Sequence, residues 1–132
     1  MNPKFRSLQG IKILVVDDDA DSRDFISFLL EEDGAQVTSV SSAIEVLQVL
    51  TELKFDILLS DIGMPEMDGY MLIREIRTWP PEQGGQIPAI ALTAYAGEYN
   101  LQQALTAGFQ LHVSKPAEPD ELIAAVAKLA GR

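Results

Sequence analysis

Five short runs that are either nearly continuous or alternating in apolar residues lie along the chain, separated by segments in which apolar residues recur at helical spacing. The runs cover residues 11–16, 35–40, 57–59, 87–92 and 109–114. They are too short for helices and are bounded by turn-forming residues, which is typical of buried strands. After the third run, Gly63 and Pro65 follow Asp61 and do not fit the interior of a strand. Each run therefore predicts one strand.

The segment after the first strand predicts an amphipathic helix. Asp21 or Ser22 is placed to cap its start, and Gly34 is suited to the left-handed conformation that ends many helices. The apolar face of this helix is expected to contain Phe25, Ile26, Phe28, Leu29 and Leu30.

Four more helices follow the other strands. The starts of three of them are marked by Ser42 with Glu45 at capping-box spacing, by Asp68 and by Pro119. The fourth helix, over 97–107, is rich in Gln and Ala, and Leu101 and Leu105 are expected to point inward. Strands and helices therefore alternate through the whole chain.

This alternation predicts an α/β fold. Strands separated by helices pair in parallel through right-handed crossovers, which place helices on both faces of the sheet. Five βα units are too few for an eight-stranded barrel, so we expect an open three-layer (βα)5 sandwich. Residues 1–9 lack periodicity and are expected to be a lead-in or linker, with one domain over residues 10–132.

Composition narrows the classes of function. The chain has 132 residues, 10 basic and 20 acidic, and a net charge of −10, which disfavours direct binding to nucleic acid. It contains no cysteine, so thiolate catalysis and thiolate metal sites are excluded. No apolar stretch approaches the roughly 20 residues of a membrane span, and no signal segment is evident, so we expect a cytoplasmic protein without membrane contact.

Functional side chains follow four of the five predicted strands. Asp17 and Asp18 follow the first, Asp61 the third, Thr93 the fourth and Lys115 the fifth. Because the carboxyl ends of parallel strands lie at one edge of a sheet, these side chains are expected to converge there. The sequence therefore predicts a polar site built from residues that are far apart in the chain.

Three neighbouring carboxylates repel one another, and one Lys cannot neutralise them. A hard divalent cation can, and Mg²⁺ prefers a few carboxylates, a carbonyl and water. A carboxylate beside Mg²⁺, Lys115 and the Thr93 hydroxyl suits a phosphoryl group, with Asp61 as the nucleophile. Ala94 leaves room for that group beside Thr93.

The chain resembles the receiver domains of two-component response regulators over about residues 10 to 130. The resemblance is carried by four segments, 14–19, 60–69, 91–94 and 114–116, which read LVVDDD, SDIGMPEMDG, ALTA and SKP. It implies a flavodoxin-like sheet of order 2-1-3-4-5. The wording of residues 60–65 and 108–112 is most similar to receivers attached to hybrid sensor kinases.

The resemblance also implies roles for individual residues. Asp61 would accept a phosphoryl group, with Mg²⁺ held by Asp17, Asp18, Asp61 and the backbone carbonyl of Gly63. Thr93 and Lys115 would contact the phosphoryl group, and the peptide bond before Pro116 would be cis. The donor would be a histidine kinase or a histidine phosphotransfer domain. The output would go to a downstream effector or to kinase domains of the same protein, through a surface of the fourth helix, fifth strand and fifth helix.

One position departs from the family pattern, and two others affect how water reaches the phosphoryl group. The aromatic ring that usually moves together with the Thr is replaced by His112, the only histidine. This ring either serves the same steric purpose or makes switching depend on pH through its charge. Near the acceptor, Gly63 has no side chain to orient water and Tyr95 is placed to cover the site, so we expect slow loss of the phosphoryl group.

Two alternatives stay open at this stage. Asp17 and Asp19 form the D-x-D pattern of an aspartyl-nucleophile phosphatase, although Asp21 stands where that chemistry usually has Thr. A receiver-like binding module that is never phosphorylated is the other alternative. The expected protein is a signalling domain and not an enzyme.

Overall fold

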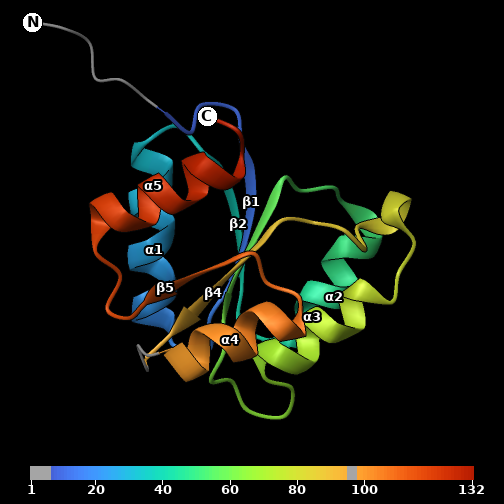
Figure 1. The fold of residues 1–132 in the computed structure, drawn as a ribbon. Helices are drawn as coiled ribbons and strands as arrows, with labels where there is room; N and C mark the ends of the chain where they lie inside the picture. Colours follow the sequence, from blue (N-terminus) through green and yellow to red (C-terminus); the bar gives the residue numbers. More distant parts are fainter. Residues whose placement is uncertain (1–6, 95–97) are drawn as a thin grey trace, which may run out of the picture.

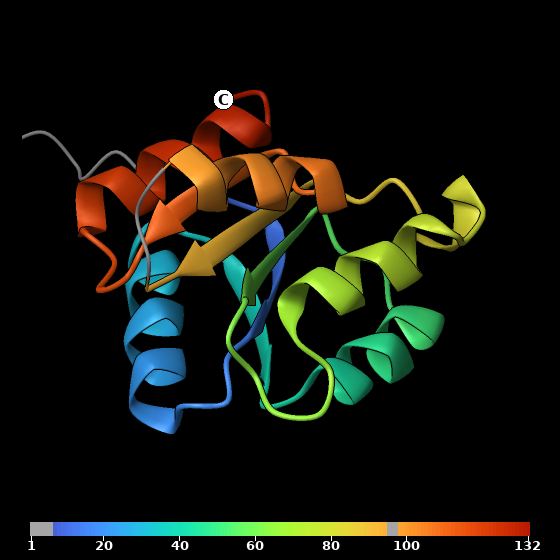
Figure 2. The same cartoon turned by 60° about the horizontal axis from the view of Figure 1, so that its bottom comes forward.

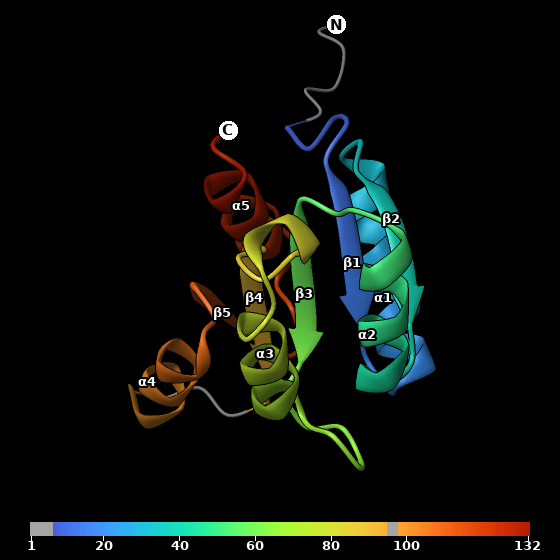
Figure 3. The same cartoon turned by 90° about the vertical axis from the view of Figure 1, so that its right-hand side faces the viewer.

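A computed structural model describes residues 7–94 and 98–132 and contains, in this part of the chain, a five-stranded parallel sheet of order β2-β1-β3-β4-β5. The α/β fold and the strand order expected from the sequence are confirmed. The strands are β1 (Lys12–Val16), β2 (Gln36–Val40), β3 (Ile57–Asp61), β4 (Ala89–Thr93) and β5 (Leu111–Ser114). The arrows of β1, β2 and β3 point the same way in Figure 3.

Helices cover both faces of the sheet. They are α1 (Ala20–Glu32), α2 (Ala43–Glu52), α3 (Gly69–Arg77), α4 (Glu98–Ala107) and α5 (Pro119–Leu129), with a short 3-10 turn at Pro81–Gln83. α1 and α5 lie on one face, and α2, α3 and α4 lie on the other (Figures 1 and 2). The fold is therefore the three-layer sandwich that the alternation of strands and helices predicts.

Alternate strand residues form two separate cores. Ile13 and Val15 of β1 pack with the buried side chains of α1 and α5, including Ile26 and Leu122. Leu14 and Val16 pack on the opposite face with residues of α2, α3 and α4. β3 and β4 are buried on both faces, which is the reason for their nearly continuous apolar sequence.

The start of α1 differs from the expectation. Asp19 is the N-cap, because its Oδ1 accepts hydrogen bonds from the backbone N–H groups of Asp21 (2.9 Å) and Ser22 (3.3 Å). The prediction that Asp21 or Ser22 caps the helix is wrong. Either residue would also have been chemically suitable, so the residue type alone does not fix the position. Gly34 follows the helix with φ +99°, as its predicted role requires.

Other expectations need correction at exposed positions. Phe25 and Phe28 of α1 are 47% and 59% exposed, and Leu105 of α4 is 41% exposed, so none of them belongs to the buried face. These helices bury narrow stripes, with Ile26 and Leu30 as the buried residues of α1. A periodic apolar pattern indicates a helix but does not set the width of its buried face.

The chain is already packed before residue 10. Leu8, within the segment expected to be a lead-in, is fully buried, and its backbone N–H donates to the carbonyl of Asp33. The hydroxyl of Ser7 also donates to the Asp33 carboxylate. Among the described helices, none combines the length and the apolar character that crossing a membrane requires.

Candidate functional site

The register of the strands brings the predicted site residues to one edge of the sheet. Asp61 is the last residue of β3 and pairs with Leu92 of β4. Thr93, the next residue of β4, pairs with Ser114 at the end of β5, directly before Lys115. Asp17 follows β1, whose last residue pairs with Ser60 of β3. The polar residues at the ends of four different strands therefore come together at this edge.

Three carboxylates and one ammonium form the centre of the site. One oxygen each of Asp17, Asp18 and Asp61 lies within 4.8 Å of the others. The Lys115 Nζ donates a hydrogen bond to Asp17 Oδ2 at 2.9 Å and lies 3.5 Å from Asp61 Oδ1. Asp17 and Asp61 are buried, whereas Asp18 is exposed. The ammonium thus links the two buried carboxylates and leaves the third open to solvent.

The loop after β1 is fixed by contacts that the sequence analysis did not find. The backbone N–H of Asp19 donates to Asp17 Oδ1 at 2.9 Å, which holds the buried carboxylate from its other side. Arg23 of α1 donates from Nη1 to the backbone carbonyl of Asp17 at 2.8 Å. The i, i+6 spacing of Arg23 and Asp17 matches no common motif, so the sequence offered no signal for this contact.

The loop after β3 depends on a close backbone approach at Gly69. A Cβ placed on Gly69 would lie 2.6 Å from the backbone oxygen of Asp61 and 2.9 Å from the Cα of Ile62. The Gly69 N–H donates to the Ile62 carbonyl at 2.9 Å and closes the loop. A Cβ on Gly63, in contrast, would meet no atom within 4 Å apart from those of its two neighbours in the chain. Gly69 therefore lets α3 begin directly against the backbone of Asp61, while the position of Gly63 faces open space.

Burial and the Asp17 carboxylate raise the pKa of Asp61 to about 6, against the opposing effect of the Lys115 ammonium. Asp18 adds to the upward shift. Burial lowers the pKa of Lys115, but its hydrogen bond to Asp17 and the charge of Asp61 raise it, and the net shift is upward. The negative charge at this edge therefore exceeds what one Lys neutralises.

The donor set fits a hard divalent cation. Mg²⁺ binds oxygen ligands at about 2.1 Å in octahedral geometry, so two of its ligands lie about 3 to 4 Å apart. The three carboxylate oxygens, within 4.8 Å of one another, need only small side-chain rotations to reach that spacing. Burial and the charge of Asp17 raise the pKa of Asp61, and a bound cation would offset the second of these two effects.

The remaining predicted residues belong to β4 and β5 or follow these strands in the chain. Thr93 is buried and Ala94 is exposed beside it. The Nε2 of His112 is buried without a hydrogen-bond partner among the described residues. The peptide bond between Lys115 and Pro116 is cis, the isomer that the resemblance implied. Tyr95, expected to cover the site, lies outside the described residues.

Comparison with known proteins identifies the family. The family model described as response regulator receiver domain matches residues 13–127, and the chain belongs to this family. It is 48% identical over 118 residues to the "uncharacterized 14.6 kDa protein in sodA1 3′ region" of Leptolyngbya boryana, covering 89% of this chain and 88% of that protein.

Two further similarities carry information about context. The chain is 36% identical to response regulator SaeR of Staphylococcus aureus over 91% of its own length, and it spans 50% of that relative. Among solved structures, it resembles the receiver domain of the sensor histidine kinase PA1611 of Pseudomonas aeruginosa, with a TM-score of 0.83 and 32% identity. That match covers 93% of this chain and 99% of the other, and the other structure has a magnesium ion coordinated in its active-site cleft.

Proposed function

We propose that this domain accepts a phosphoryl group on Asp61 and changes its surface in response. The observation that carries the proposal is the arrangement of Asp17, Asp18 and Asp61 within 4.8 Å, with Lys115 bridging the two buried carboxylates. A nucleophile, a cation site and a fixed ammonium are then present together. Membership of the receiver family supports the same role.

In the proposed reaction, a carboxylate oxygen of Asp61 attacks the phosphorus of a phosphohistidine. A P–O bond forms while the P–N bond breaks, and the electron pair leaves with the imidazole, which takes up a proton. Lys115, already at hydrogen-bonding distance from the cluster, would hold one phosphoryl oxygen, and the Thr93 hydroxyl would donate to another. The exposed Ala94 beside Thr93 leaves space for the incoming group.

The cation proposed for this site is Mg²⁺, with Asp17, Asp18, Asp61 and the backbone carbonyl of Gly63 as its protein ligands. When bound, it would neutralise charge on the phosphoryl oxygens and so assist their transfer. Its presence in the related PA1611 receiver supports this choice. The three carboxylates contribute more negative charge than Lys115 balances, so the site favours a divalent over a monovalent ion.

The proposed switch uses Thr93 and His112. A phosphoryl group adds about −1.5 to −2 charge and three acceptor oxygens at the end of β3, which would draw the Thr93 hydroxyl toward it. His112 lies on β5 two strands from the acceptor, on the face that packs with α4, and its ring would move into the space vacated. The surface of α4, β5 and α5 would change as a result.

The proposed partners are a histidine kinase or a histidine phosphotransfer domain as donor, and a downstream effector or kinase domains of the same protein as output. The similarity to a receiver from a sensor histidine kinase supports this choice. The net charge of −10 supports partners other than nucleic acid, and the domain would act in the cytoplasm. It would assist only its own phosphorylation and dephosphorylation and would not turn over a separate substrate.

Acetyl phosphate labelling tests the proposal. The protein should incorporate one phosphoryl group in the presence of Mg²⁺, and both Asp61→Asn and a chelator should abolish incorporation. No labelling of the parent protein would favour the alternative of a binding module that is never phosphorylated. Sustained turnover of a small phosphate ester would favour a phosphatase, although Asp19 is already used as the cap of α1.

A further inference from the structure

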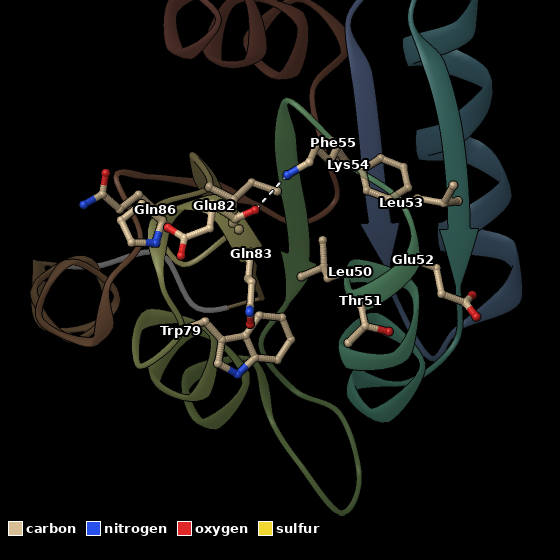
Figure 4. Close-up of a pocket in the computed structure, with 13 residues that line it drawn as sticks. Leu50, Thr51, Glu52, Leu53, Lys54, Phe55, Trp79, Glu82, Gln83 and Gln86 are labelled. Carbon is tan, nitrogen blue, oxygen red and sulfur yellow. Dashed lines mark hydrogen bonds between the residues drawn. The ribbon is translucent and has the colours of Figure 1, made fainter.

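A pocket of about 600 Å³ lies at the edge of the sheet opposite to Asp61. Its lining comes from the end of α2, from the residues that lead into β3, and from the segment between α3 and β4 (Figure 4). The apolar part of the lining consists of Leu50, Leu53, Phe55, Trp79, Pro81 and Ile87. Because Phe55 precedes β3 and Ile87 precedes β4, the pocket is separated from the acceptor by the full length of these strands.

The pocket continues along the outer surface of α2. A second hollow of about 610 Å³ is lined by Ile44, Leu47 and Gln48 and shares Thr51, Glu52 and Trp79 with the first. We call the two hollows together the α2 groove. α2 has 10 residues, so the groove follows about 15 Å of helix. An elongated groove of this kind suits a polypeptide segment better than a compact small molecule.

The walls of the α2 groove are held in place without a ligand. The indole Nε1 of Trp79 donates to Glu75 Oε2 at 3.3 Å, which orients the ring. Lys54 Nζ donates to the backbone carbonyl of Glu82 at 2.7 Å, joining the two sides of the pocket (Figure 4). Gly85 packs so closely that an added Cβ would lie 1.9 Å from the backbone oxygen of Trp79. The pocket is therefore largely preorganised, which reduces the entropy lost on binding.

Apolar side chains and unpaired carboxylates lie side by side in this groove. Ile44 is 46% exposed and Leu53 is 54% exposed. Glu52 and Glu82 also line the pocket, and in the described part of the chain neither forms an ion pair with Lys or Arg. The ammonium of Lys54 is directed to a backbone carbonyl and does not neutralise them. The groove thus combines apolar surface with negative charge.

The apolar surface and the negative charge together indicate which kind of ligand would bind in the α2 groove. An indole face next to carboxylates attracts a guanidinium or ammonium group that also carries an apolar stem. A second copy of this chain would bring another net charge of −10 to an acidic groove, so repulsion opposes self-association here. The complementary surface is therefore basic and apolar.

We propose that the α2 groove binds a basic amphipathic segment of a partner protein. An apolar side chain of that segment would enter the pocket beside Trp79, and an Arg or Lys would lie against Glu52 and Glu82. The groove is remote from Asp61, so this interaction is separate from phosphoryl transfer and does not rest on it. It gives the domain a second surface, by which a partner is held while the acceptor edge stays accessible.

Trp79 provides a direct probe, because it is the only tryptophan in the chain. The binding probe is a panel of synthetic peptides of about three helical turns, with Leu and Ile at varied positions along one face and Arg along the other. Matched peptides carry Glu in place of Arg, or Ser in place of Leu and Ile. At least one basic amphipathic peptide should give a saturable change in Trp79 emission, and both kinds of matched peptide should bind at least about tenfold more weakly.

Variants of the intact protein localise the binding by calorimetry. Leu53→Ser and the pair Glu52→Gln with Glu82→Gln should each weaken binding of that peptide by about tenfold. The pair Glu31→Gln with Glu32→Gln makes the same charge change on exposed positions of α1 and should leave the affinity unchanged.

Four results would overturn the proposal. They are no saturable binding by any basic amphipathic peptide, equal weakening by the α1 control pair, equally tight binding of arginine amide alone, or a dimer of this chain that Leu53→Ser dissolves. The first result would show that the α2 groove does not bind such a peptide. The second would show that binding does not depend on the carboxylates of the groove in particular. The third identifies a small-molecule site, and the fourth identifies a second copy as the occupant.

Discussion

Replacement of Asp61 by Asn should stabilise the fold at neutral pH in the absence of divalent cations. Asp61 is buried, 6% exposed, and its pKa is raised from 3.8 to about 6 by burial and by Asp17. A shift of about 2 units corresponds to about 3 kcal/mol between the two protonation states. Asn keeps the shape of the side chain and removes the charge that causes this penalty.

The sign of the pH dependence follows from the direction of the shift. The folded-state pKa of Asp61 lies above the unfolded value, so the folded state binds the proton more tightly. The contribution of protonated Asp61 to the free energy of unfolding is fully present below about pH 4 and is lost as the pH rises through about 6. The free energy of unfolding of Asp61→Asn should therefore exceed that of the parent at pH 7.5, and the difference should shrink toward pH 4.

Thermal unfolding in the presence of a chelator measures this difference. A gain of about 1 to 3 kcal/mol raises Tm by about 4 to 10 °C for a domain of this size. Glu31→Gln, an exposed position on α1, is the matched control and should change stability by less than about 0.5 kcal/mol. Millimolar Mg²⁺ should raise the Tm of the parent more than that of Asp61→Asn. If neither Asn nor Mg²⁺ raises Tm, the description of a strained carboxylate cluster is wrong.

Three further predictions test parts of the site and the switch. Lys115→Met should move the carboxyl titration of Asp61, followed by ¹³C NMR, above the value of about 6, because the ammonium lowers that pKa; an unchanged midpoint would contradict the assigned charge interaction. Gly69→Ala should lower Tm by more than about 8 °C, since its Cβ would lie 2.6 Å from the backbone oxygen of Asp61, whereas Gly63→Ala should change it little. His112→Phe should keep the phosphorylation-dependent change in hydrogen exchange of α4, and His112→Ala should lose most of it. Equal behaviour of the two His112 variants would exclude a steric role for the ring.

The convergence of Asp61 with the other strand ends was predictable, because it follows from the alternation of strands and helices. Once 57–59 is a strand and the sheet is parallel, Asp61 must lie at the same edge as the ends of the other strands, and its position between β1 and β4 follows from the strand order that the resemblance implied. Thr93 and Lys115 are placed by the same rule, at the ends of β4 and β5. Their convergence needs no knowledge of side-chain packing, since strand ends share one edge.

Features that depend on tertiary packing were not predictable. The burial of Leu8 against α1 and α5 has no local signal, because a single Leu before a strand fits a linker equally well. Phe25 and Phe28 have the spacing of a buried face, but α1 buries only a narrower stripe of its residues against the sheet. Arg77 was also missed, although its guanidinium donates to the carbonyls of Gly108 and Gly85 and joins α3 to two loops.

The α2 groove was likewise missed. Trp79 and Leu53 belong to segments that the sequence shows only as a helix end and a loop. Their proximity arises from the way α2 and α3 pack next to each other on the sheet. Local patterns identify each segment, whereas a pocket between segments depends on their relative placement.

The most direct test of the central claim is to locate the phosphoryl group on the chain. After reaction with acetyl phosphate and Mg²⁺, reduction by borohydride converts an aspartyl phosphate to homoserine, which peptide mass spectrometry assigns to a residue. We predict modification at Asp61 and at neither Asp17 nor Asp18, because both Asp17 carboxylate oxygens already accept hydrogen bonds, from the Asp19 N–H and the Lys115 ammonium, and Asp18 is exposed. Modification at Asp17 or Asp18, or none at all under these conditions, would contradict the assignment of Asp61 as the phosphoacceptor.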